Sequence, residues 1–204
     1  MTGRKRRSRG GRGRSEAGVS LIEILLALAV LGIMSGVAVA IMANIMPEVH
    51  ADSSLEMIEA TLQQAHEAAI SQRRNFEVSF LGTNEIKVER VELSGSLTTT
   101  SDNFLGNGVA YALVTGVPDT PDNFSGGPGA PGLADNFGNA EIVFASDGTA
   151  VDASGNVVNG TIFMAIGTNP TTARAVTVMG ATGKVTGYSY NGSIPCPSGK
   201  VCWD

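Results

Sequence analysis

The N-terminal part of the chain contains a long run of apolar residues with almost no charge. Between residues 19 and 46 the only charged residue is Glu23, and residues 24–43 form an uncharged stretch of twenty. At about 1.5 Å per residue, a helix of this length covers the bilayer's hydrocarbon core of about 30 Å. The pattern therefore predicts a helix over residues 19–46 that is able to cross a membrane.

Beyond this run, the hydrophobic pattern takes on a helical period. Apolar residues recur at spacings of three and four, with charged and amide side chains between them. These apolar positions are Leu55, Ile58, Leu62, Ala65, Ala69 and Ile70. We therefore predict that an amphipathic helix continues over residues 47–75 and packs its apolar stripe against a β-sheet. Pro47 is expected to bend or interrupt the helix, and Ser53 with Glu56 forms a capping-box pattern for a restart.

From residue 76 onward the apolar residues alternate with polar ones, which is typical of half-buried strands. The side chains of Phe76, Val78, Phe80, Ile86 and Val88 are predicted to face one way, with a hairpin turn at residues 82–84. Further strands are predicted at residues 109–114, 141–145, 161–166, 174–179 and 184–190, separated by Gly, Asp, Asn and Pro clusters. The predicted fold class is α+β: a long N-terminal helix, first transmembrane and then amphipathic, packed on an antiparallel β domain over residues 76–204.

Composition adds a strong charge asymmetry. The chain has 204 residues, 14 Lys and Arg against 19 Asp and Glu, and 26 Gly. Seven of the basic residues precede position 15, so residues 1–18 form a basic, Gly-rich leader without the apolar residues that a core needs, while the rest carries a net charge of −11. A basic block before an apolar run is typical of the cytoplasmic flank of a membrane segment.

Three interpretations of this N-terminal pattern stay open on physical grounds. The helix is a membrane anchor, or it is a secretory signal peptide that is cut after Ala40, within an A-x-A-like sequence. The third interpretation gives Glu23 a purpose, because an acid within an apolar segment is costly in lipid and usually marks function.

Residues 18–31, GVSLIEILLALAVL, resemble the processing signal of type IV pilins and type II secretion pseudopilins. The similarity includes the charged leader ending in Gly18, the acid at Glu23 and the uncharged helix that follows. This resemblance implies that prepilin peptidase removes residues 1–18 by cutting after Gly18 and that Val19 becomes the N-methylated terminus. It also implies that Glu23 pairs with the terminal amine of a neighbouring subunit in a filament, where each buried charge compensates the other.

The remainder of the chain resembles one subfamily. Residues 62–78, 141–148, 173–178 and 183–185 are similar to the H-type pseudopilins and the FimT-like minor pilins. The resemblance implies a single-pass inner-membrane protein with a cytoplasmic leader and a periplasmic β domain. Its implied partners are other pilin-like subunits in a periplasmic filament, prepilin peptidase and an assembly platform driven by a separate ATPase.

The sequence offers little catalytic chemistry, so we predict that the protein is not an enzyme and needs no cofactor. It has two histidines, His50 and His66, without H-E-x-x-H or zinc spacing. We expect His66 to be a solvated or satisfied helix residue. Cys196 and Cys202 are the only cysteines, and in a chain placed outside the cytoplasm we expect them to form a structural disulfide. The rival interpretation, redox catalysis, lacks the C-x-x-C spacing.

The sequence contains two weaker candidate binding sites, of which the first is for calcium. Asp147, Asp152 and Asn156 carry oxygen ligands that suit calcium, but their spacing is not that of an EF-hand, so a solvated turn is favoured.

The second weak site is a basic patch for nucleic acid. Its members are Arg73, Arg74, Lys87 and Arg90. The net charge of −11 beyond residue 18 opposes phosphate binding, so salt bridges from these cations to Glu67, Glu77, Glu85 and Glu89 are favoured.

We therefore hypothesise a filament subunit, most similar to a minor pseudopilin of type II secretion. A minor or major type IV pilin, including one for DNA uptake, is the alternative within the same class. An exported soluble protein whose signal is cut after Ala40 is the alternative from another class.

Overall fold

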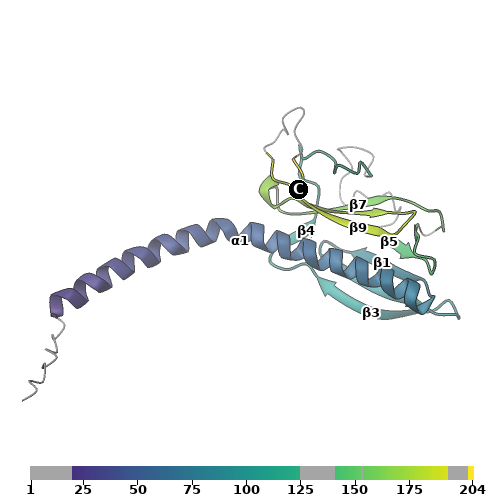
Figure 1. Cartoon of the computed structure of the whole chain (residues 1–204), viewed down its shortest axis with the longest axis horizontal. Coiled ribbons are helices and arrows are strands. Elements are labelled where there is room, and N and C mark those ends of the chain that lie inside the picture. The colour runs from purple at the N-terminus through teal and green to yellow at the C-terminus, as the bar shows by residue number, and fades with distance from the viewer. Residues whose placement is uncertain (1–19, 125–140, 153, 193–201) are drawn as a thin grey trace, which may run out of the picture. The chain divides into compact units, whose positions relative to one another are not determined.

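A computed structural model describes residues 20–124, 141–152, 154–192 and 202–204. The chain divides into two compact units, Met1–Ala43 and Asn44–Asp204. Figure 1 shows the elements of both units, which are described separately below.

Helix α1 spans Leu21–Gln72 and is the only α-helix in the described part of the chain. In the first unit it is apolar all the way round, and every side chain of Leu21–Ala38 is exposed. In the second unit it is amphipathic, with Leu55, Ile58 and Leu62 buried, as the helical period predicts. Ile70 departs from that prediction, because it is 47% exposed.

Of the bend or interruption expected at Pro47, the structure excludes the interruption. Pro47 lies inside α1, and the helix continues through it. Ser53 does not cap a new helix, because its hydroxyl donates to the carbonyl of Val49, one turn back, at 2.9 Å. Ser54 makes the same kind of bond to His50, at 3.0 Å.

The end of α1 is set by Arg73, which adopts a left-handed conformation with φ of 51°. The amide of Arg74 then donates to the carbonyl of Ala69 at 3.1 Å, which is the long-range bond of a Schellman cap. This turn reverses the chain and starts the first strand.

The strands form two antiparallel sheets, where the sequence predicted one. The first has the order β3-β2-β1-β5-β6, from β1 (Phe76–Leu81), β2 (Glu85–Val91), β3 (Leu97–Phe104), β5 (Glu141–Phe144) and β6 (Ala150–Val151). The second has the order β4-β7-β8-β9, from β4 (Val109–Tyr111), β7 (Gly160–Ile166), β8 (Arg174–Met179) and β9 (Lys184–Ser189). A short 3-10 helix, η1 (Pro170–Thr172), precedes β8. The antiparallel α+β fold class is confirmed, and β3 and β6 were not predicted.

One hydrophobic core joins α1 to both sheets. Leu62 of α1, Phe76 of β1 and Met164 of β7 belong to the same buried cluster. The predicted alternation is confirmed, because Val78 and Ile86 also lie in this cluster. Burial of each such side chain contributes about 1.5–3 kcal/mol, so the cluster fixes the second half of α1 on the sheets.

A smaller cluster covers the other face of the second sheet. Trp203 packs edge-on to Tyr190 at 5.2 Å between ring centroids and donates from its indole nitrogen to the carbonyl of Pro118 at 3.1 Å. Asp204 pairs with Ser189 through two backbone hydrogen bonds of 2.8 and 2.9 Å. The C-terminal residues thereby extend the edge of this sheet beside the end of β9.

Candidate functional site

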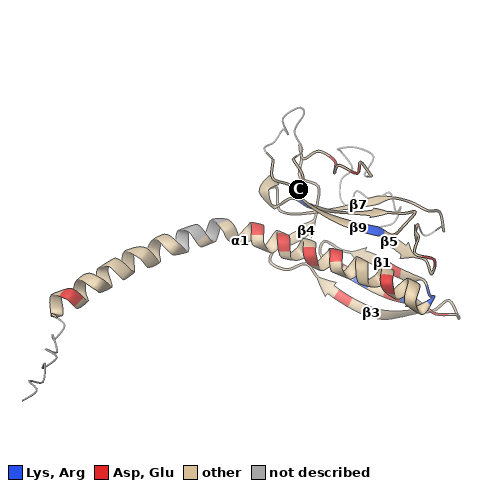
Figure 2. Cartoon of the chain, in the orientation of Figure 1, with Lys and Arg blue, Asp and Glu red and all other residues tan. Residues whose placement is uncertain are grey.

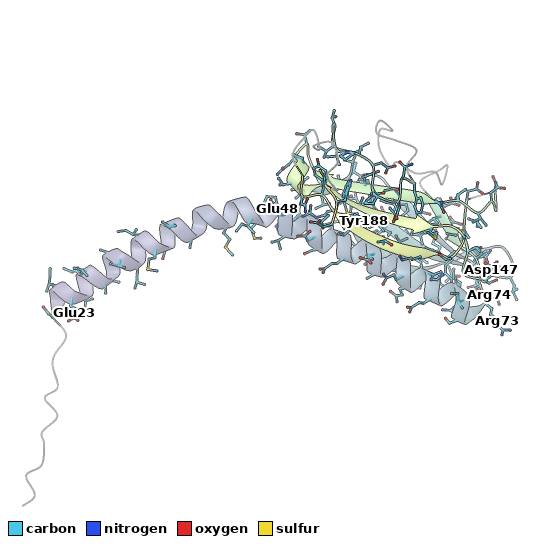
Figure 3. All side chains as sticks on the ribbon, turned by 45° about the horizontal axis from the view of Figure 1, so that its top comes forward. Glu23, Glu48, Arg73, Arg74, Asp147 and Tyr188 are labelled. Atoms are coloured by element: carbon cyan, nitrogen blue, oxygen red, sulfur yellow. The ribbon has the colours of Figure 1, made fainter. Side chains whose placement is uncertain are left out.

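The N-terminal apolar segment begins with a fixed helical turn around Glu23. The carbonyl of Ser20 accepts hydrogen bonds from the amides of Glu23 at 3.0 Å and Ile24 at 3.2 Å. Glu23 is exposed in the first turn of α1, where Figure 3 labels it. A carboxylate in this position interacts favourably with the positive end of the helix dipole.

This segment needs an apolar environment outside its own chain. Leu21–Ala38 has a mean hydropathy of 2.4, none of it is buried, and its length and composition are sufficient to cross a membrane. A lipid bilayer or a bundle of other helices would satisfy it. A signal sequence near the N-terminus has the same apolar character and length. Gly18 and Val19, the predicted processing residues, lie outside the described residues.

The four basic candidate residues do not form one patch. Lys87 and Arg90 lie on opposite faces of β2, because Arg90 stands opposite the buried Phe76 and alternate residues of a strand face opposite ways. Arg90 donates to Gln72 of α1 at 3.2 Å and from Nε to Glu92 at 2.8 Å. Figure 3 labels Arg73 and Arg74 at the C-terminal end of α1.

Salt bridges were predicted for these cations, and the structure shows two. Lys87 pairs with Glu89 at 2.8 Å, as expected. The partner of Arg90 is Glu92, which was not among the predicted acids. Hydrogen bonds from Arg90 and Thr98 lower the pKa of the Glu92 carboxyl. These carboxylates compete with any phosphate for the same cations.

The carboxylates of the calcium candidates Asp147 and Asp152 accept hydrogen bonds from residues of their own turns. Asp147 accepts hydrogen bonds from the amide and hydroxyl of Thr149, at 3.0 and 2.7 Å, which lower the pKa of its carboxyl. Asp152 accepts from the side-chain amide of Asn156 at 3.1 Å and from its backbone amide at 2.8 Å, and its pKa is lowered in the same way. Among the described residues, no three His, Cys, Asp or Glu side chains are grouped to hold a metal ion.

His50, His66 and Cys202 hold structural positions. His66 packs against Phe144 at 5.5 Å between ring centroids, and its Nε2 lies 3.1 Å from the carbonyl oxygen of Gly148. His50 lies 3.0 Å from the side-chain amide of Asn107. Cys202 is buried beside Trp203 in the smaller cluster, whereas Cys196 lies outside the described residues, so their pairing stays a prediction.

One ion pair, between the buried Arg174 and the half-exposed Asp52, was not predicted from the sequence. Arg174 on β8 is almost fully buried and donates to Asp52 of α1 at 2.6 Å and to the carbonyls of Thr171 and Ala173 at 2.8 and 2.9 Å. With Glu48 and Tyr190, it lines a cavity of about 340 Å³. Asp52 and Arg174 are far apart in the sequence, and only the fold brings them together. No local sequence pattern predicts this pair.

Neither protein-family models nor curated protein sequences match the chain. Among solved structures, it is similar to the type IV minor pilin FimU of Pseudomonas aeruginosa, with 18% identity and a TM-score of 0.45 over 66% of this chain and 85% of that chain. It is also similar to the minor pseudopilin EpsH from the Type 2 Secretion System of Vibrio cholerae, with 15% identity and a TM-score of 0.46 over 69% of this chain and 97% of that chain.

Proposed function

We propose that this protein is a structural subunit of a pilus-like filament, most similar to a minor pseudopilin of type II protein secretion. The observation that carries the proposal is Glu23, the only charge between residues 19 and 46, five residues after Gly18 and the basic leader. An anchor or a signal peptide alone has no use for a carboxylate there. We assign the protein no catalytic residue and no cofactor.

In this proposal, prepilin peptidase cuts after Gly18 and the new amine of Val19 is methylated. The removal of residues 1–18 takes seven cations away from the end of the helix, so that it can leave the membrane surface. Glu23 of one subunit then pairs with the Val19 amine of a neighbour. Such a pair specifies the register of the helices, because either charge left alone in an apolar bundle costs several kcal/mol.

The second unit is proposed to lie in the periplasm, with the leader of the precursor in the cytoplasm. Its buried helix stripe packs with both sheets in one hydrophobic core. The partners in this proposal are other pilin-like subunits, the peptidase and an inner-membrane platform whose ATPase is a separate protein. DNA uptake is disfavoured by the net charge of −11 beyond residue 18 and by the carboxylates that pair with Lys87 and Arg90.

Isolation of filaments from the native organism tests the proposal. Pilus-like filaments are sheared or extracted with mild detergent, separated by sedimentation, and probed with an antibody against the second unit. We expect the chain in the filament fraction together with other pilin-like subunits. Recovery only as a soluble periplasmic protein would instead support the exported protein whose signal is cut after Ala40.

A further inference from the structure

Strand β3 forms an open edge of the first sheet. It pairs with β2 on one side, and among the described strands it has no partner on the other. With eight residues it is the longest described strand, and all of its side chains are exposed or half-buried. It contains no proline and no lysine, the residues that commonly protect an edge from pairing. Its outer backbone groups are therefore available to another extended chain.

A cavity lies beside this edge. It has a volume of about 230 Å³ and lies between α1 and β3, with Ala65 and Ala68 on the helix and Thr100 and Ser101 on the strand. The register of β2 and β3 shifts between Val88 and Glu89, so β3 carries one extra residue at Thr100. A bulge re-aims side chains, and here two successive residues line the same cavity. It offers room for one side chain of an added strand.

The outer face of the same sheet is acidic. Its outward positions on β1, β2, β3 and β5 hold the carboxylates Glu77, Glu85, Glu89, Asp102 and Glu141 and one cation, Lys87. Glu77 stands directly opposite Glu89, and its pKa is raised first by burial and then by the acids Glu141 and Glu89. Asp102 lies on the edge strand itself, so it would be the direct neighbour of a side chain on an added strand.

We propose that β3 binds an extended, basic segment of a partner protein by strand addition, with lysine or arginine opposite Asp102. Backbone hydrogen bonds along β3 supply the affinity, and Asp102 with the cavity at Thr100 supplies the selectivity. A second copy of this chain fits less well, because antiparallel pairing of two β3 strands around a two-fold axis joins two acidic faces on the same side. The proposal does not depend on assembly of the chain into a filament.

A labelled peptide of alternating lysine and valine, about eight residues long, is a suitable probe for the full-length protein in detergent micelles. Fluorescence anisotropy is expected to show saturable binding, and hydrogen exchange is expected to slow at residues 97–104. The same peptide with methylated backbone nitrogens keeps its charge but loses its donors, so we expect no binding. Equal binding of both peptides, or protection at another segment, would overturn strand addition.

Charge reversal tests the selectivity. Asp102→Lys is expected to weaken binding of the basic peptide about tenfold, since an attractive cross-strand pair becomes a repulsive one. Glu67→Lys, which adds the same charge at an exposed position of α1, is the matched control and should bind as the wild type does. Unchanged affinity of Asp102→Lys, with Trp203 fluorescence showing an intact fold, would contradict the proposal. So would concentration-dependent protection of residues 97–104 without peptide, which would show that a second copy occupies the edge.

Discussion

The guanidinium of Arg174 on β8 and the carboxylate of Asp52 on α1 join through a 2.6 Å hydrogen bond between residues 122 positions apart. The two partners differ in their surroundings. The Arg174 side chain is 6% exposed, whereas that of Asp52 is 50% exposed. Asp52 can therefore be solvated without Arg174, but the buried charge of Arg174 depends on Asp52.

This asymmetry predicts unequal effects of substitution. Asp52→Ala leaves a buried charge without its counter-ion and should lower the free energy of unfolding by about 3 kcal/mol. Arg174→Met should cost less, about 1–2 kcal/mol, because the carbonyls of Thr171 and Ala173 lose a donor while Asp52 turns to water. Urea unfolding followed by the fluorescence of Trp203, the single tryptophan, measures both values. A larger loss for Arg174→Met than for Asp52→Ala would contradict this account of the pair.

Gly183 is predicted to be the least replaceable glycine in contact with α1. It has φ of 63°, and a Cβ at this position would lie 2.4 Å from the ring of His66 and 2.5 Å from the carbonyl oxygen of Gly148. Gly82 is a matched control, because it has φ of 59° and a Cβ added there would meet no atom within 4 Å. Gly82→Ala should cost about 1 kcal/mol from backbone strain alone, and Gly183→Ala at least about 1 kcal/mol more. Equal losses in urea unfolding would refute the close approach of His66.

The pKa of Glu77 is raised by burial and by the acids Glu141 and Glu89, so its ionised form destabilises the fold. The native state holds its proton more tightly than the unfolded state, so stability falls as pH rises from about 4.5 through the raised pKa. Glu77→Gln should raise the urea midpoint at pH 7 and lose this advantage below the ordinary glutamate pKa.

Glu89 provides the opposite case on the neighbouring strand. Hydrogen bonds from Lys87 and Thr99 lower the pKa of its carboxyl, so its ionised form stabilises the fold above the ordinary value and this contribution disappears as pH falls through the lowered pKa. Glu89→Gln should therefore lower the urea midpoint at pH 7. If Glu77→Gln and Glu89→Gln changed the urea midpoint at pH 7 in the same direction, the environments assigned to these two carboxylates would be wrong.

The role proposed for Glu23 predicts a defect in assembly but not in processing. Glu23→Ala should be cut after Gly18 as the wild type is, and its recovery in filaments should fall at least about tenfold, because the amine of a neighbour loses its counter-charge. Glu48→Ala removes the next carboxylate along the helix, outside the apolar run, and serves as the matched control. Quantitative immunoblots of the filament fraction measure the effect. Wild-type recovery of Glu23→Ala would refute the pairing.

Local patterns predicted the elements whose side chains alternate between core and solvent. The stripe from Leu55 to Ala69 and the alternation from Phe76 to Val88 are buried as expected, because α1 and β1–β2 each have one face on the core. Strand β3 was not predicted because none of its side chains is buried and its sequence shows no apolar alternation. The missed split into two sheets depends on which strands pair, which periodicity does not report.

The candidate sites show the same division. Glu23 can be recognised from the sequence alone, because every other residue between positions 19 and 46 is uncharged. Arg174 appears in sequence as an ordinary cation at the start of a predicted strand, and its partner Asp52 is supplied only by tertiary packing. Arg90 was likewise assigned the wrong acids, since the turn after β2 brings Glu92 to it. Figure 2 shows how widely the acidic residues are spread along α1 and the sheets, so composition does not determine which acid pairs with which cation.

Mass spectrometry of the N-terminal peptide, from membranes of the native organism, tests the central claim most directly. We predict a mature chain that begins at a methylated Val19, with residues 1–18 absent and the apolar helix retained. A terminus at Ile41 would contradict this claim, because the helix with Glu23 would then be a discarded signal peptide and the mature protein an ordinary secreted β protein.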